Sequence, residues 1–136
     1  MGRIASGSIR SWAQADRFLG RAQSLNTGQR STEVVRESDT VIRVWYHRTP
    51  VVTYYKPGTT EKVATMDTQG WKTPTTINRM QEFVPEGVEI FTAGEDEDGH
   101  PEMVMLRDEK NGVENHPLTA GPYHMGNKTP ERRRIR

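Results

Sequence analysis

The chain has 136 residues, a hydrophobic content of 32%, a mean hydropathy of −0.83 and no cysteine. This length fits one domain flanked by tails, with apolar residues for one small core. The lack of cysteine excludes a disulfide framework, thiol catalysis and cysteine-ligated zinc. No apolar run reaches the roughly 20 residues of a membrane span, so we expect no membrane partner.

Charge is segregated along the sequence, although the net charge is only +1. Residues 1–81 carry twelve Lys/Arg against six Asp/Glu, a net +6. Residues 82–114 carry two against eleven, a net −9, and residues 115–136 carry five against one, a net +4. Such separation favours an anionic partner at one face and complementary packing at another. The simpler alternative is a solvated acidic hairpin followed by a loose basic tail.

Residues 1–31 are predicted to form one short helix and a connection. Ser11 can cap a helix, because apolar residues then recur at helical spacing: Trp12, Ala15, Phe18, Leu19 and Ala22. Residues 23–31 are rich in Gly, Asn, Ser and Thr, which indicates a connection without regular structure.

Residues 32–110 are predicted to form the folded core. Val, Ile, Thr, Tyr and Trp are frequent in the first half of this region, which predicts strands over residues 32–36, 40–47, 50–55 and 63–68. The sequence Lys-Pro-Gly-Thr at residues 56–59 predicts a turn between the last two strands.

A central helix is predicted next, capped by Thr73 with Pro74 at its first position. Its buried stripe comprises Ile77, Met80 and Val84. Residues 88–93 and 102–107 then predict a hairpin with an acidic turn, and residues 111–136 an extended basic tail that contains prolines and glycines. The order of helix, sheet, helix and hairpin predicts an α+β domain with a small, mainly antiparallel sheet.

The start of the central helix is the best candidate site in the sequence. Unpaired backbone N–H groups and a partial positive charge at a helix start accept phosphate or carboxylate, and an exposed Trp can stack on a base. The predicted binding residues are Trp71, Lys72, Thr73, Thr75, Thr76 and Arg79. Alternatively, Trp71 fills the edge of the core at a strand–helix junction.

A secondary patch is predicted on the strand over residues 41–47. Alternation places Ile42, Val44 and Tyr46 on one face and Arg43, Trp45 and His47 on the other. Arg and His beside an exposed Trp suit contacts to single-stranded nucleic acid. In the alternative reading, Trp45 packs under the N-terminal helix while Arg43 and His47 decorate its rim.

The sequence contains no motif that indicates a catalytic residue, a metal site or a cofactor. The four histidines lack the spacing of a structural metal site. The acidic turn Glu95-Asp96-Glu97-Asp98-Gly99 fails the EF-hand pattern, because Gly94 and Met105 would stand where that loop needs carboxylates. A P-loop, a nucleophile elbow and a dinucleotide fingerprint are also missing. We therefore expect binding rather than an enzymatic reaction.

Two segments resemble a widespread family of small, mostly uncharacterised bacteriophage proteins. Residues 44–54 are similar to the His-x-Thr-x-Val-Val strand of that family, and residues 65–80 to its Thr-Gly-Gly-Trp-x-Thr-x-Thr-Thr-Lys-x-Arg-Met-Asn motif, which can have Ile in place of Met. Phe18-Leu19-Gly20-Arg21 is similar to the N-terminal element of the family. The resemblance covers roughly residues 15–92. The chain departs from the pattern at Gln69, Ile77 and Gln81, where the family has Gly, Lys and Asn.

The resemblance implies a phage origin, with action in the host bacterial cytoplasm or in a virion. We expect a non-enzymatic protein that binds nucleic acid or a nucleotide through the helix start, for example to sequester a nucleotide signal in counter-defence. The alternative is a virion or assembly component, or an accessory docked on a large host complex, that makes contacts through Arg132, Arg133, Arg134 and Arg136. A third possibility is an inhibitor whose acidic hairpin, Glu95 to Asp98, mimics nucleic acid.

Overall fold

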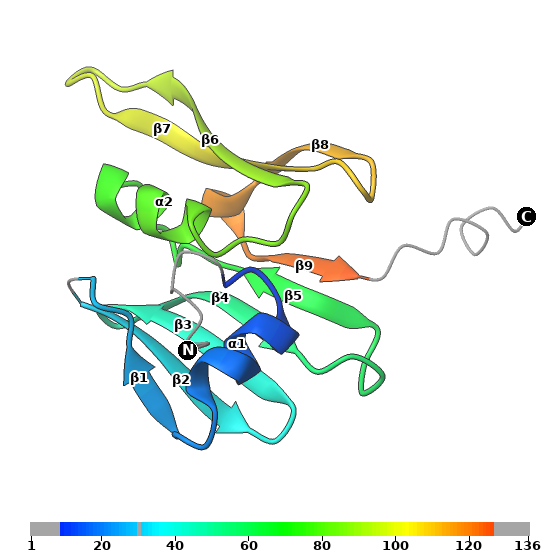
Figure 1. Ribbon diagram of the computed structural model, residues 1–136. Coiled ribbons are helices and arrows are strands. Elements are labelled where there is room, and N and C mark those ends of the chain that lie inside the picture. The colour runs from blue at the N-terminus through cyan, green and yellow to red at the C-terminus, as the bar shows by residue number, and fades with distance from the viewer. Residues whose placement is uncertain (1–8, 30, 127–136) are drawn as a thin grey trace, which may run out of the picture.

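The computed structural model describes residues 9–29 and 31–126, which form two helices and two antiparallel sheets (Figure 1). The predicted α+β class is therefore confirmed. The predicted assembly contacts rest on four arginines that lie outside the described residues: Arg132, Arg133, Arg134 and Arg136.

The larger sheet has six strands in the order β1-β2-β3-β4-β5-β9. Their bounds are β1 Ser24–Asn26, β2 Thr32–Ser38, β3 Val41–Tyr46, β4 Thr49–Tyr55, β5 Lys62–Met66 and β9 Tyr123–Gly126. The strands predicted over residues 32–68 are confirmed, and the predicted turn at residues 56–59 is closed by a hydrogen bond from Thr59 N to Lys56 O. The short strand β1 corrects the predicted connection at residues 23–31, because it pairs with β2 at the edge of the sheet.

The first helix, α1 (Trp12–Leu19), begins as predicted and ends earlier. The Ser11 hydroxyl accepts a hydrogen bond from Gln14 N at 3.2 Å. The helix stops before Ala22 because Gly20 has φ 58°, a positive value that helical residues do not adopt and that glycine tolerates. Its apolar stripe, which includes Trp12 and Leu19, is buried against β2 and β3.

The second helix, α2 (Pro74–Gln81), lies between the two sheets and contacts β4 and β6 (Figure 1). Thr73 caps it as predicted, and Met80 is fully buried. Ile77, also predicted in the buried stripe, is only partly buried against the core.

The smaller sheet has the order β6-β7-β8, with β6 Val88–Glu95, β7 Pro101–Asp108 and β8 Val113–Pro117. The predicted hairpin is thus confirmed as β6 and β7. The extended tail that we predicted from residue 111 is wrong up to residue 126. β8 pairs with β7, a 3-10 turn covers Leu118–Ala120, and β9 pairs with β5.

The buried carboxylate of Asp108 joins the smaller sheet to β9. Tyr123 donates its hydroxyl proton to Asp108 Oδ2 at 2.7 Å, and the Asn111 side chain donates to the same atom at 2.7 Å. A buried charge needs several hydrogen bonds to offset its desolvation. Together with the buried side chains of Leu118 and Met125, these bonds hold residues 118–126 against the fold.

The side chain of Tyr54 connects three parts of the core. It is fully buried on β4, and its hydroxyl lies 2.6 Å from Phe83 O, just beyond α2, and 3.2 Å from Ile9 O, just before α1. Arg10 Nη1 donates to Val84 O at 2.8 Å beside it. Burial raises the Tyr54 pKa well above its ordinary value, and the nearby charge of Arg10 opposes this only in part.

This pKa shift predicts a loss of stability in alkaline solution. The raised pKa keeps Tyr54 protonated in the folded state, whereas the unfolded chain loses that proton above about pH 10, so the free energy of unfolding falls as pH rises further. Tyr54→Phe should cost about 1 kcal/mol at neutral pH through the lost hydrogen bond. Above about pH 10 the free energy of unfolding should fall less steeply with pH in Tyr54→Phe than in the wild type, by up to about 1.4 kcal/mol per pH unit.

Urea unfolding of both proteins between about pH 7 and pH 11 measures this difference. The two stability curves should converge on the alkaline side. Curves that stay parallel over the whole range would show that Tyr54 does not resist ionisation in the fold.

Candidate functional site

A groove of about 710 Å³ lies between two connections of the larger sheet. One wall is the β3–β4 turn and the other is the segment between β5 and α2. None of the residues that line the groove carries a carboxylate. The lining residues are Tyr46, His47, Arg48, Thr49, Gln69, Trp71, Thr73, Thr75 and Thr76. The fold thus brings His47, from the predicted secondary patch, to four of the residues predicted at the helix start.

The β3–β4 turn holds His47 in an unusual backbone conformation. His47 has φ 57°, in the left-handed region that glycine prefers in a tight hairpin turn. Its N–H donates to Ser31 O at 2.9 Å, and its ring meets the Tyr46 ring edge-on at 4.4 Å between centroids. His47 is exposed, so its ring is accessible from solvent. Strained backbone of this kind is frequent at binding sites.

The segment after β5 turns sharply before α2 begins. The buried Thr68 anchors it, because its hydroxyl accepts from Gly70 N and its carbonyl accepts from Trp71 N. Gln69 has φ 54° and Gly70 has φ 86°, so this turn contains two consecutive left-handed residues. The turn directs Trp71 outward, where it is 54% exposed. The alternative in which Trp71 fills the edge of the core is therefore wrong.

The threonines at the helix start bond mainly to one another. Thr73 Oγ1 lies 2.9 Å from Thr76 Oγ1 and 3.4 Å from Thr75 Oγ1, and it accepts from Thr76 N at 3.4 Å. Pro74 has no N–H to donate. Among the described residues, nothing accepts from the N–H of Thr75. The helix start therefore offers hydroxyl groups and one free N–H to the groove, rather than the array of N–H groups that we expected.

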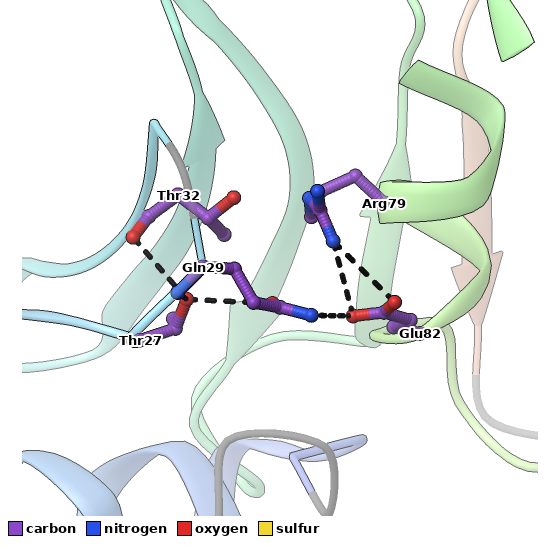
Figure 2. Close-up of polar contacts among 5 residues, drawn as sticks. All are labelled: Thr27, Gln29, Thr32, Arg79 and Glu82. Atoms are coloured by element: carbon purple, nitrogen blue, oxygen red, sulfur yellow. Dashed lines mark hydrogen bonds and ion pairs between the residues drawn. The ribbon is translucent and has the colours of Figure 1, made fainter. Parts of the chain in front are cut away.

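Arg79 and Lys72 do not line the groove, although both were predicted in the site. The guanidinium of Arg79 packs over the Tyr46 ring at 5.5 Å, and its Nη1 contacts Glu82 Oε2 at 3.4 Å. Figure 2 shows that Glu82 also accepts from Gln29 Nε2, at 2.6 Å, so a polar network links α2 to the β1–β2 turn. Arg79 thus supports the groove from behind Tyr46 and is engaged with a carboxylate.

Lys72 is exposed and lies near the acidic hairpin tip. The pKa of Asp96 is lowered, first by the hydrogen bond from His100 N, and the charge of Lys72 is among the smaller contributions. The tip also brings Asp96, Asp98 and His100 together, with ligand atoms within 4.8 Å of one another. The comparison with the EF-hand pattern missed this grouping because that pattern tests carboxylates at fixed positions of the loop and does not use a histidine ring as a ligand. The Asp96 carboxylate itself serves the turn, since it accepts from the N–H groups of Asp98 and His100.

Arg43 lies outside the groove, on the face of β3 opposite the buried Ile42 and Val44. Its Nε donates to Thr53 Oγ1 at 3.2 Å, and its Nη1 is 3.9 Å from Glu37. Trp45, on the same face, is partly exposed and donates its indole N–H to Glu37 at 2.8 Å. Trp45 is not part of the buried core, so it does not pack under α1 as the alternative reading had it.

Tyr46, Arg48, Thr49 and Gln69 were not predicted in the site but line the groove. For Gln69, a signal was available in the sequence. It stands where the resembling family has glycine, and the structure gives it a left-handed backbone.

Neither helix in the described part of the chain is long and apolar enough to cross a membrane. Comparison with models of protein families, with curated proteins and with solved structures gave no match for this chain. The resemblance to the bacteriophage family therefore stays a prediction.

Proposed function

We propose that the groove binds a nucleotide, or a base and phosphate of single-stranded nucleic acid, and that the protein acts by binding rather than by catalysis. The observation that carries this proposal is the exposed Trp71 ring, which stands beside cationic and hydroxyl groups in a groove lined by no carboxylate. A volume of about 710 Å³ is within the range of small-molecule sites.

The ligand would be held by three kinds of contact. Trp71 would stack on the base, since base–aromatic stacking contributes about 1–3 kcal/mol and tolerates any base. The guanidinium of Arg48 and the imidazole of His47 would contact phosphate oxygens. The hydroxyl and free N–H of Thr75 would donate to the same anion, and the Gln69 amide can pair with a base edge.

The setting of this activity follows from the sequence resemblance, which implies a bacteriophage protein that acts in the host bacterium or in a virion. Sequestration of a nucleotide signal in counter-defence fits a groove of this size better than recognition of a duplex does. A single exposed ring stacks on an unpaired base, whereas bases of a duplex are already stacked on one another.

Removal of the Trp71 ring should weaken binding without unfolding the protein. Trp71→Ala should reduce affinity for mononucleotides or short single strands about 5-fold to 150-fold, because one stacking contact is lost. Lys72→Ala is the matched control, since Lys72 is adjacent and exposed but lies outside the groove. Isothermal titration with nucleotides and anisotropy of labelled single strands measure both variants. Equal affinities of wild type and Trp71→Ala would refute the proposed site.

The backbone strain at His47 gives a second test, in which stability and binding move in opposite directions. His47→Gly should raise the free energy of unfolding by about 1 kcal/mol, because glycine adopts a positive φ without steric cost. The same change should weaken phosphate binding, because the imidazole is lost. Urea unfolding and nucleotide titration of the same preparation provide the two readouts.

Arg48→Gly is the control for this test, because Arg48 is in the same turn but has no positive φ. It should weaken binding without the gain in stability. A His47→Gly variant that is both less stable and unchanged in affinity would contradict the role given to His47.

A further inference from the structure

The outward face of the β6–β7 hairpin carries a group of apolar residues that are wholly or partly accessible to solvent. Val104 and Leu106 point inward and are fully buried, so the alternate residues of β7 point outward. The register places Phe91 opposite Met105 and Ala93 opposite Met103 on this face. Met103 is 39% exposed, whereas Phe91, Ala93 and Met105 are partly buried. An exposed apolar side chain with apolar neighbours on the same sheet face can form the centre of an interaction site.

Acidic residues surround this apolar face. Residues 88–117 carry nine Asp/Glu against two Lys/Arg, a net −7. One of the two cations, Arg107, is already engaged, since its Nη1 lies 2.6 Å from Glu89 and its guanidinium stacks over Phe91 at 5.0 Å. A partner for this surface must therefore supply positive charge around an apolar contact.

The body of the same chain has the complementary charge. Residues 9–29 and 31–81 carry ten Lys/Arg against six Asp/Glu, a net +4. Asp16 of α1 is neutralised by Arg36 of β2 at 2.7 Å. Arg17 on α1 and Arg21 just after it are exposed and have no ion pair among the described residues. Figure 1 shows α1 and the β6–β7 hairpin at opposite ends of the molecule, on either side of α2.

We infer that the protein self-associates head to tail, with the hairpin face of one copy docked on the α1 end of the next. Phe91, Met103 and Met105 supply the apolar contact, and the acidic tip of the hairpin meets Arg17 and Arg21. The two surfaces differ, so the contact is heterologous and builds a closed ring or an open filament rather than a two-fold dimer. None of the residues named in this contact lines the groove.

Light scattering coupled to gel filtration tests the contact on the full chain. In about 0.1 M salt the wild type should exceed the 15.5 kDa of one chain, and in about 1 M salt the charge contribution should be screened and the mass should fall. Met103→Glu should lower the association constant at least about tenfold. Met103→Leu is the control, because it keeps an apolar side chain at the same exposed position. A wild type that stays monomeric in low salt, or equal effects of the two variants, would overturn the inference.

A charge swap identifies the two surfaces. Glu95→Lys, Glu97→Lys and Asp98→Lys together reverse the charge of the tip without touching the Asp96 carboxylate, which holds the turn. Arg17→Glu with Arg21→Glu reverses the receiving end. Each of these variants alone should be monomeric, and an equimolar mixture should associate, because every contact between the two variants again joins opposite charges. Circular dichroism checks that each variant is folded. A mixture of folded variants that stays monomeric would rule out this contact, and any association would then have to use other surfaces.

Discussion

The arrangement of the molecule depends on the buried hydroxyl of Tyr54. An uncompensated hydroxyl in the core would cost about 1–3 kcal/mol, so its hydrogen bond to Phe83 O fixes where the chain leaves α2. Because Tyr54 is on the central strand β4, this bond ties the end of α2 to the middle of the larger sheet. Ile9 O approaches the same hydroxyl, so the segment that leads into α1 is placed by the same group.

The candidate groove is a consequence of this anchoring. Side-chain bonds converge on the end of α2: Arg10 donates to Val84 O, and Gln81 Oε1 accepts from Ile90 N of the smaller sheet. Within residues 9–29 and 31–126, the start of the helix has no comparable connection to the core apart from the buried Thr76, and it lies beside the β3–β4 turn. The stable end of the helix thus holds its exposed end in place, where Trp71 and the threonines face solvent. A rigid scaffold that presents a site on loops is the usual arrangement for recognition.

Local signals in the sequence were enough to predict the elements that depend on neighbouring residues. Thr73 before Pro74 marked the start of α2, and alternation gave the faces of residues 42–45 correctly. The predicted place of His47 on that strand was wrong, because His47 lies in the β3–β4 turn and lines the groove together with Tyr46. The edge strands β1, β8 and β9 were missed because their few residues are held by pairing with distant strands and by contacts such as that of Tyr123 with Asp108. The same limit applies to the site. Sequence spacing put Arg79 with Trp71, whereas tertiary packing turns Arg79 toward Tyr46 and Glu82.

The acidic hairpin tip lies within electrostatic reach of the groove wall, since the charge of Lys72, next to Trp71, contributes to the lowered pKa of Asp96 at the tip. An anionic ligand in the groove would therefore experience repulsion from that tip. In the head-to-tail contact, the arginines of the next copy would neutralise the tip and reduce this repulsion. Association and anion binding would then favour each other, because coupling between two sites is reciprocal. In this scheme the charge segregation along the sequence has a physical role, because the contact between the acidic tip and the arginines of the next copy would raise the affinity of the groove for an anion.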